Sequence, residues 1–250
     1  MSERMLESKN AIVTGANRGI GKSIVEILAS QGCNIFACAR KENPIFEDNM
    51  TQLEGKFGVH IYVKYFELDD KEQIKNAIKE IVKATKEIDI LVNNAGIGHS
   101  SLFAMTRMDD LEKVFKINTF APMLITQLVV KHMMKNKTGS IVNIGSVQGM
   151  DSSALNCAYG PSKAALISFT KCLAAEVAQF GIRVNAVAPG GTETEILDTL
   201  SSDEKEYLIN KSASGRLGKT EEVANVVAFL VSDKASFVNG QVIRIDGGAK

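Results

Sequence analysis

The sequence lacks three features that would point to particular classes of protein. It has no excess charge, because 29 Lys and Arg residues balance 29 Asp and Glu residues, so no overall field favours nucleic acid or an anionic membrane. It has no apolar run near the roughly 18 residues of a membrane span, and its first residues, MSERMLESKN, contain no apolar signal core. We therefore expect a cytoplasmic protein with a small-molecule partner, no nucleic acid and no membrane.

Metal-binding and disulfide-forming residues are also sparse. A chain of 250 residues can build a core without disulfides, and its four cysteines lack the CxxC pairing of a zinc site. We expect buried thiols in a reducing compartment at Cys33, Cys38, Cys157 and Cys172. Histidines occur only at 60, 99 and 132, without paired-ligand spacing, so no metal site is predicted. The methionines between 105 and 150 are interpreted as core residues that fill gaps.

Short apolar, β-branched runs alternate with longer amphipathic segments, which is typical of βαβ units around a parallel sheet. The predicted strands are 11–13, 34–39, 60–66, 88–92, 140–144, 183–188 and 241–245. Segment 71–85 carries apolar residues at three- and four-residue spacing, which predicts a helix. No linker or repeat interrupts the alternation. The prediction is an α/β, Rossmann-type, doubly wound parallel seven-stranded sheet in a single domain over 1–250, with an irregular substrate-side loop at about 190–215.

Three glycines follow the first predicted strand in the stretch TGANRGIG. Glycines at 15, 19 and 21 permit a tight turn, close approach of the backbone to a phosphate, and close packing of the next helix, whose N-terminus attracts anions. Because a predicted strand precedes the stretch and a helix follows it, the stretch indicates a dinucleotide cradle, although its spacing differs from GxGxxG. The alternative is a set of turn-making glycines without a ligand.

Two cations near this cradle favour a 2′-phosphate. Arg18 lies within it, and Arg40 ends the second predicted strand, where an NAD-binding protein usually carries Asp or Glu. A hydrogen bond to a charged group contributes about 1.5–3 kcal/mol, so one arginine could favour NADPH over NADH by about 10- to 100-fold. We therefore expect NADP(H) as the cofactor. NAD(H) remains the alternative, because Glu42 could reach the ribose.

Further motifs occur in order along the chain: NNAG at 93–96, Asn118, Ser146, Tyr159 with Lys163 four residues later, and Pro189 with Gly190. Together with TGANRGIG, they resemble the short-chain dehydrogenase/reductase family over nearly the whole chain. Within that family, IVNIGSVQG and VNGQVIRIDGG are most similar to the 3-oxoacyl-acyl-carrier-protein reductases. The resemblance implies an NAD(P)-dependent oxidoreductase acting on CH–OH groups.

Tyr159 and Lys163 form an acid-base device at the start of a predicted helix. A free phenol has a pKa of about 10, so little of it is ionised at neutral pH. Spacing of four residues places both side chains on one helix face, where a cation about 4 Å away contributes on the order of 4 kcal/mol of attraction and could lower the phenol pKa by up to about 3. We expect Tyr159 to exchange a proton with a substrate oxygen near pH 7. An amphipathic helix without catalytic role is the alternative.

The resemblance implies a role for each motif residue. Ser146 orients the substrate carbonyl, and Asn118 completes a catalytic tetrad with Tyr159 and Lys163 by holding a helix irregularity and a water that relays protons. The implied cofactor site comprises Gly15, Asn17, Arg18, Gly19, Ile20, Gly21, Arg40, Glu67, Leu68, Asn94, Ala95, Gly96, Tyr159, Lys163, Pro189, Gly190, Thr192 and Thr194. The helices after the fourth and fifth strands resemble those through which this family assembles, so we expect a homotetramer.

The substrate is less sharply defined. Segments 148–157 and 191–215, which set specificity in this fold, differ from the carrier-protein reductase pattern, and Phe180 stands where those enzymes often carry Arg. Losing a basic residue weakens steering of an acidic carrier protein, and Lys137 offsets this only in part. We expect NADPH-dependent reduction of a ketone, with a 3-oxoacyl thioester or acyl carrier protein as the leading partner. The alternatives are a sugar, polyol or other small ketone, or a non-catalytic NADP-binding subunit.

Overall fold

Seven parallel strands form one sheet in the order β3-β2-β1-β4-β5-β6-β7. The structure is a computed structural model that describes residues 4–151, 153–195 and 202–248. The strands are β1 (Asn10–Thr14), β2 (Asn34–Ala39), β3 (Ile61–Tyr65), β4 (Ile90–Asn93), β5 (Gly139–Ile144), β6 (Ile182–Pro189) and β7 (Val242–Ile245). The predicted doubly wound, parallel seven-stranded α/β fold is confirmed, and each predicted strand agrees with the observed one to within two residues at either end.

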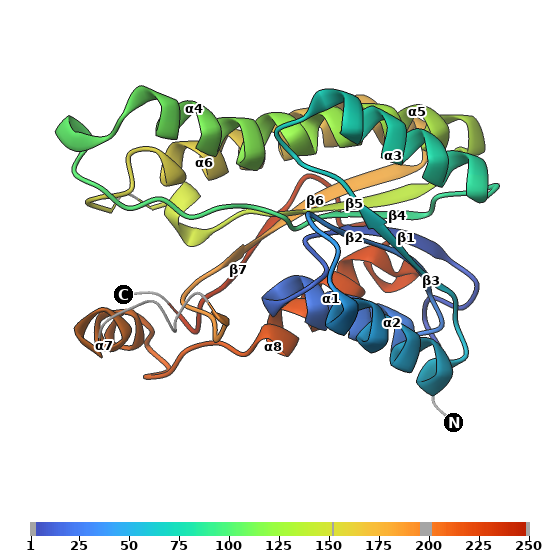
Figure 1. The fold of residues 1–250 in the computed structure, drawn as a ribbon, viewed down its shortest axis with the longest axis horizontal. Helices are drawn as coiled ribbons and strands as arrows, with labels where there is room; N and C mark the ends of the chain where they lie inside the picture. The colour runs from blue at the N-terminus through green and yellow to red at the C-terminus, as the bar shows by residue number, and fades with distance from the viewer. Residues whose placement is uncertain (1–3, 152, 196–201, 249–250) are drawn as a thin grey trace.

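Helices cover both faces of this sheet (Figure 1). One face carries α3, α4, α5 and α6, and the other carries α1, α2 and α8. Their bounds are α1 (Gly19–Ser30), α2 (Pro44–Phe57), α3 (Lys71–Ala84), α4 (Met108–Phe115), α5 (Ala121–Asn136), α6 (Tyr159–Val177), α7 (Ser202–Lys211) and α8 (Thr220–Val231). A π-helical turn, η2 (Lys116–Phe120), joins α4 to α5, and a 3-10 turn, η3 (Val147–Gly149), follows β5. Among the described residues, none of the helices combines the length and apolar character needed to cross a membrane.

Alternate residues of the central strands pack into two apolar cores, one on each face. In β1, Ala11 and Val13 join the core beneath α1 and α8, whereas Ile12 joins the core beneath α3 and α5. All three residues are fully buried. Burial on both faces explains why the strands are near-continuous apolar runs in the sequence rather than alternating ones.

Local signals fix the ends of two of the helices. The Asp70 carboxylate accepts hydrogen bonds from the backbone N–H groups of Glu72 and Gln73 at 2.9 and 3.1 Å, which begins α3 at the predicted residue. Asn43 caps α2 in the same way, and Gly58 ends that helix with a φ of 68° in the left-handed region.

Three expectations about individual segments are wrong. The segment 190–215 is not wholly irregular, because it contains α7, while its residues 196–201 lie outside the described part. Cys157 and Cys172 are exposed, because one lies in a surface loop and the other on the outer face of α6. Met105, Met108 and Met150 are exposed as well, unlike Met133, because they lie in or beside loops at the edge of the sheet.

The strand order determines where a ligand can enter. The chain moves from β1 outward to β3 and then returns to the other side of β1 with β4, and the helices that follow β1 and β4, α1 and α4, lie on opposite faces of the sheet. In doubly wound folds, ligands bind in the crevice beyond the carboxyl ends of the strands. The loops after β4, β5 and β6 extend to the same edge of the molecule, at the left of Figure 1.

Candidate active site

The turn between β1 and α1 is shaped for close approach of backbone to a ligand. Gly15 and Gly19 have φ values of 65° and 51°, in the left-handed region that glycine tolerates best. A Cβ on Gly21 would lie 2.0 Å from the backbone oxygen of Gly15, so only glycine fits there. Arg18 begins α1 without a side-chain cap, which leaves the first N–H groups of the helix available to an anion.

The loop after β4 is tied directly to this turn. The Thr14 hydroxyl accepts hydrogen bonds from the backbone N–H groups of Asn94 and Ala95 at 3.0 and 3.1 Å. The Asn94 amide donates to the backbone oxygens of Thr14 and Gly15 at 2.9 and 3.1 Å. These bonds join segments about eighty residues apart in the sequence. Thr14 was not identified as a site residue; its only signal was its position at the end of the first strand.

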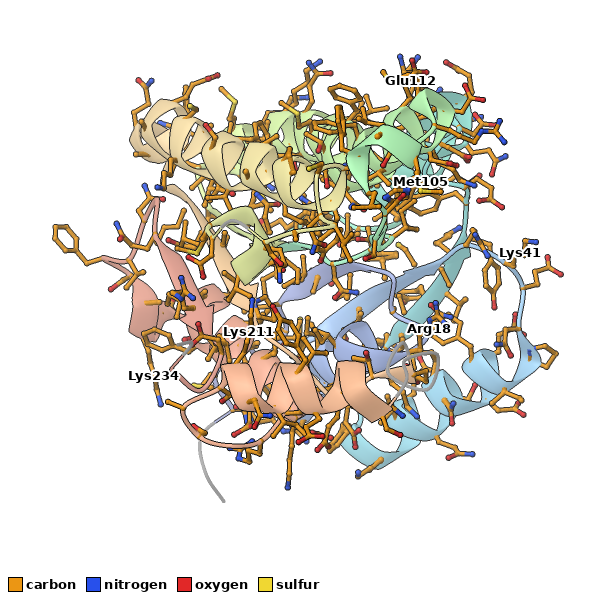
Figure 2. The ribbon with its side chains drawn as sticks, turned by 90° about the vertical axis from the view of Figure 1, so that its left-hand side faces the viewer. Arg18, Lys41, Met105, Glu112, Lys211 and Lys234 are labelled. Atoms are coloured by element: carbon orange, nitrogen blue, oxygen red, sulfur yellow. The ribbon has the colours of Figure 1, made fainter. Side chains whose placement is uncertain are left out.

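Cations gather at the adenosine end expected for the cofactor. Arg18 and Arg40 are both exposed, at the start of α1 and the end of β2. Among the described residues, no carboxylate pairs with either guanidinium. Lys41 lies on the same side of the molecule as Arg18 in a view of the strand-end edge (Figure 2). A cradle that excludes Cβ atoms, next to free guanidinium groups, fits a dinucleotide with an additional phosphate.

The other residues expected to contact the cofactor lie around this cradle. Asn17 is exposed and Ile20 half-buried at the start of α1, while Glu67 and Leu68 are half-buried after β3. The backbone N–H of Glu67 donates to the Gln73 side chain at 3.0 Å, which fixes that loop on α3.

The loop after β6 reaches the cradle from the opposite side. Pro189 ends β6, and the N–H of Gly190 donates to the backbone oxygen of Ile245 at 2.9 Å. Thr192 is buried, and its hydroxyl donates to the backbone oxygen of Gly190 at 3.1 Å. A Cβ on Gly19 would lie 3.2 Å from Cγ2 of Thr194, so this loop packs against the turn after β1.

Asn118 lies in the π-helical turn η2 and is fully buried. Its side-chain oxygen accepts from the N–H of Ile97 at 2.8 Å, and its amide donates to the backbone oxygen of Ile97 at 2.9 Å. The amide also donates to the Ser162 hydroxyl on α6 at 3.1 Å. Asn118 therefore holds the loop after β4 against α6. The helix irregularity expected at this residue is present, since π-helical turns are rare and concentrate at functional sites.

Tyr159 and Lys163 project from the first turns of α6 toward the end of β5. The Lys163 ammonium is buried and donates to the backbone oxygen of Ile144 at 2.8 Å. A Cβ on Gly96 would lie 3.1 Å from the Asn118 side-chain oxygen and 3.2 Å from Nζ of Lys163, so both groups converge on this glycine. Ser146 lies two residues beyond Ile144, is buried, and accepts from the N–H of Gln148 at 3.2 Å. The structure thus brings the four predicted catalytic residues to one side of the crevice.

The electrostatics differ from the expectation for Tyr159. Burial raises the pKa of the Tyr159 phenol above its usual value, and the Ser146 hydroxyl lowers that pKa by a smaller amount. Burial also lowers the pKa of Lys163 to about 8. The ammonium lies 5.9 Å from the centre of the Tyr159 ring, and its hydrogen bond is directed to Ile144. The phenol pKa is therefore raised overall, opposite to the expectation from the Tyr159–Lys163 spacing, because desolvation outweighs the hydrogen bond from Ser146.

The fold and the site together define an oxidoreductase with a dinucleotide cradle, and comparison with known proteins specifies the family. A family model described as enoyl-(acyl-carrier-protein) reductase matches residues 15–250. The chain is 41% identical over 245 residues to the 3-oxoacyl-(acyl-carrier-protein) reductase of Thermotoga maritima, covering 97% of this chain and 98% of that protein. It is 40% identical over 249 residues to the protein of the same name from Aquifex aeolicus, covering 98% and 99%.

A solved structure is also similar to the protein over nearly the whole chain. The crystal structure of a proposed NAD(P)-dependent gluconate 5-dehydrogenase from Beutenbergia cavernae, with bound NADP at low occupancy, superposes with a TM-score of 0.92 at 29% identity and covers 98% of both chains. The protein belongs to the short-chain dehydrogenase/reductase family, as its motifs predicted. It is an NAD(P)-dependent oxidoreductase acting on CH–OH groups.

Proposed function

We propose that the protein reduces the ketone of a 3-oxoacyl thioester to a secondary alcohol with NADPH, and that acyl carrier protein presents this thioester. The observation that carries the proposal is the convergence of Ser146, Tyr159 and Lys163 beside the cradle. It is supported by relatives named 3-oxoacyl-(acyl-carrier-protein) reductase that are 41% and 40% identical over nearly the full chain.

The proposed cofactor site combines backbone, small side chains and cations. Gly15, Gly19 and Gly21 admit the pyrophosphate to the N-terminus of α1, and Arg18 and Arg40 bind the 2′-phosphate. The loops at 94–96 and 189–194 border the adenosine and nicotinamide halves. When bound, the reduced nicotinamide supplies a hydride to the carbonyl carbon.

The proton that completes the alcohol comes from a side chain of the protein. The Ser146 hydroxyl donates a hydrogen bond to the substrate carbonyl oxygen and orients it. Tyr159 then gives its phenolic proton to that oxygen, which completes the alcohol. A raised pKa keeps the phenol protonated at neutral pH, as a general acid requires, and Lys163, charged below pH 8, stabilises the phenolate that remains. Asn118 keeps the loop at Gly96 and Ile97 against α6.

Two alternatives have specific support. A keto sugar acid as substrate is favoured by the similarity to a proposed gluconate 5-dehydrogenase. The family model's description favours reduction of a carbon–carbon double bond in an enoyl thioester. A non-catalytic NADP-binding subunit needs none of the four residues, and their convergence is evidence against it.

The deciding experiment measures NADPH oxidation with a 3-oxoacyl thioester, the matching enoyl thioester and a panel of keto sugar acids. The proposal predicts the highest kcat/KM for the 3-oxoacyl thioester, rising further when acyl carrier protein replaces a small thiol. Tyr159→Phe should abolish turnover while the Kd for NADPH stays within about threefold, since it removes only the phenolic hydroxyl that gives the proton. A higher kcat/KM for a sugar acid or for the enoyl thioester would make that compound the substrate in place of the 3-oxoacyl thioester. Undiminished activity of Tyr159→Phe would overturn the proposed mechanism.

The chain also has features that support a larger assembly. We infer a cytoplasmic homotetramer, in which residues 1–250 form one domain and the segment 190–215, including α7, borders the substrate. Three exposed apolar side chains favour association: Met108 at the start of α4, Phe120 at the end of η2, and the fully exposed Phe237 in a turn before the edge strand β7. Light scattering after size-exclusion chromatography tests it: a mass of four chains supports the homotetramer, and a monomer excludes it.

A further inference from the structure

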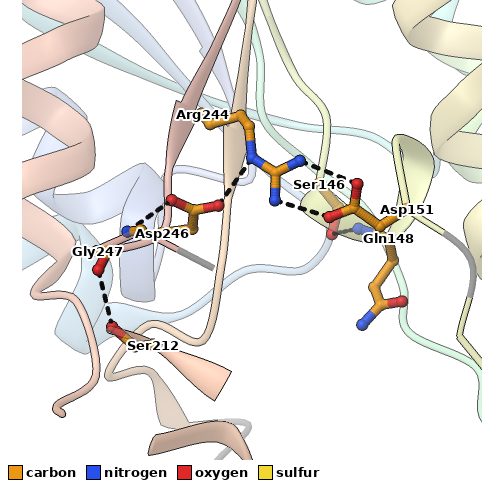
Figure 3. A network of polar contacts seen from close by, with 8 residues as sticks. Ser146, Gln148, Asp151, Ser212, Arg244, Asp246 and Gly247 are labelled. Atoms are coloured by element: carbon orange, nitrogen blue, oxygen red, sulfur yellow. Dashed lines mark hydrogen bonds and ion pairs between the residues drawn. The ribbon is translucent and has the colours of Figure 1, made fainter. Parts of the chain in front are cut away.

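An ionic network joins the loop after β5 to the C-terminal turn (Figure 3). The Arg244 guanidinium donates to both oxygens of the Asp151 carboxylate, at 2.9 and 2.7 Å. Its Nε donates to Oδ2 of Asp246 at 2.8 Å. Asp151 and Arg244 are 93 positions apart in the sequence, and neither belongs to the motifs that define the cradle or the predicted tetrad.

The Asp151 end of the network is coupled to Ser146 through a short hydrogen-bonded turn. The N–H of Asp151 donates to the backbone oxygen of Val147 at 2.8 Å, and the N–H of Gly149 donates to that of Ser146 at 3.0 Å. This turn packs tightly on α6, because a Cβ on Gly149 would lie 2.8 Å from the backbone nitrogen of Ala164. Asp151 thus lies at the end of the turn that carries Ser146, and this turn rests on the helix that carries Tyr159 and Lys163.

The other end reaches the loop after β6 and the end of α7. Asp246 packs against Gly190, where an added Cβ would lie 2.8 Å from the Cβ of Asp246. The neighbouring Gly247 backbone oxygen accepts from the hydroxyls of Ser212 and Ser214 at 3.4 and 2.9 Å. One guanidinium thus links the two segments expected to set substrate specificity, 148–157 and 191–215.

The charges make the guanidinium necessary for this arrangement. The Asp246 side chain is only 9% exposed, compared with 34% for Arg244 and 52% for Asp151, so its carboxylate depends on Arg244 as a counter-ion. The hydrogen bond from Arg244 holds the pKa of Asp151 below its usual range, and both carboxylates raise the pKa of Arg244. A bidentate arginine–carboxylate pair also fixes orientation, which a point charge does not.

We propose that Arg244 is a positioning residue for the reaction: through Asp151 and Asp246 it holds the Ser146 turn and the α7 segment in register across the substrate entrance. The proposal rests on the proposed function, because it assumes that Ser146 orients the substrate carbonyl. Displacement of a reacting group by about 1 Å costs on the order of 10²-fold in rate. Loss of the guanidinium should therefore lower kcat/KM without removing any group that contacts the substrate oxygen.

The test compares Arg244→Met, Arg244→Lys and Asp151→Asn with the native chain. We expect kcat/KM to fall by about 10- to 100-fold in Arg244→Met, with kcat reduced and the Kd for NADPH within about threefold of the native value. Arg244→Lys should recover part of the loss, because it keeps the charge but not the bidentate geometry. Asp151→Asn leaves the Arg244–Asp246 pair intact, so it remains informative if Arg244→Met does not fold. Lys64→Met, which removes an ion pair with Glu80 near the opposite edge of the sheet, is the control.

Hydrogen–deuterium exchange provides a readout that does not depend on activity. Peptides covering 147–158 should exchange faster in Arg244→Met and in Asp151→Asn but not in Lys64→Met, while peptides from α3 stay unchanged in the two network variants. Unchanged exchange in 147–158, or native kcat/KM in both network variants, overturns the proposal. If the native protein turns over none of the substrates, the proposed function fails instead, and the exchange data still decide whether Arg244 holds the turn.

Discussion

Nζ of Lys163 lies 2.8 Å from the backbone oxygen of Ile144, the last residue of β5. This contact places a buried ammonium at the end of a central strand, two residues before Ser146. Its cost is visible in the pKa of Lys163, which burial lowers from 10.5 to about 8. Burying the charged form of Lys163 near Tyr159 therefore lowers the stability of the folded protein.

The stability of the protein should depend on pH through this lysine. Because the folded-state pKa lies below the unfolded one, the unfolded chain binds more protons between pH 8 and 10.5, and stability rises with pH across that window. The native chain should gain about 2–3 kcal/mol relative to Lys163→Met from pH 7.5 to 10.5. Urea unfolding of both proteins at each pH measures the difference, in which the titration of other groups cancels. A difference independent of pH would mean that Lys163 titrates normally.

Gly21 should not tolerate a side chain, whereas Gly55 should. A Cβ on Gly21 would meet the Gly15 backbone oxygen at 2.0 Å, so Gly21→Ala must open the turn after β1. We expect it to weaken NADPH binding at least tenfold and to destabilise the fold by about 1–3 kcal/mol, as overpacking does. Nothing lies within 4 Å of a Cβ on Gly55 in α2, so Gly55→Ala should stabilise the chain by about 0.5–1 kcal/mol. Fluorescence titration with NADPH measures the affinity of each variant, and thermal unfolding measures its stability. Equal behaviour of the two variants would contradict a tight cradle.

The fold could be predicted from the sequence because its signals are local. Strands such as β2, buried on both faces, are continuous apolar runs, and α3 begins at a capping carboxylate, so both were located almost to the residue. The helix α7 was missed, because its low mean hydropathy and the Gly-rich residues that follow it resemble a loop.

The site could be predicted only where its residues form a short motif that is typical of a cofactor or catalytic site. The glycines and the Tyr159–Lys163 spacing are sequence-local features, so they were found. The bonds from Asn94 to Thr14 and from Arg244 to Asp151 join distant segments and leave no periodic signal. The predicted direction of the Tyr159 pKa shift was wrong. Spacing indicates the attraction of the Lys163 charge, but it does not indicate the desolvation of the phenol, which raises the pKa.

Arg40 should determine the preference for NADPH. It is exposed at the end of β2, and no carboxylate among the described residues pairs with it, so its guanidinium is free to bind a 2′-phosphate. Arg40→Ala should lower the NADPH/NADH ratio of kcat/KM by about 10- to 100-fold, mainly through NADPH. Lys56→Ala removes a cation on α2 that already pairs with Glu26 and should leave the ratio unchanged. An unaltered ratio in Arg40→Ala would assign the phosphate to Arg18 or Lys41.

Asn143 should contribute more to stability than its polarity suggests. It is fully buried in β5, where its oxygen accepts from the Asn93 amide at 2.8 Å and its own amide donates to the Thr170 hydroxyl on α6 at 2.8 Å. Asn143→Ala leaves both partners short of a hydrogen bond and opens a small cavity, which should cost about 2–4 kcal/mol in the free energy of unfolding. Asn225→Ala, on the exposed face of α8, should change it by less than about 0.5 kcal/mol.

The pairwise bond can be isolated with a double-mutant cycle. Thr170→Val removes the hydroxyl that Asn143 contacts, and this hydroxyl also donates to the backbone oxygen of Leu166 at 2.9 Å. If the Asn143–Thr170 bond helps to hold α6 on the sheet, the two substitutions should be non-additive by about 0.5–3 kcal/mol. Additive losses would place the stabilisation in the bond between Asn143 and Asn93. Because α6 also carries Tyr159 and Lys163, a strong coupling would mean that this buried bond supports the helix on which the proposed proton transfer depends.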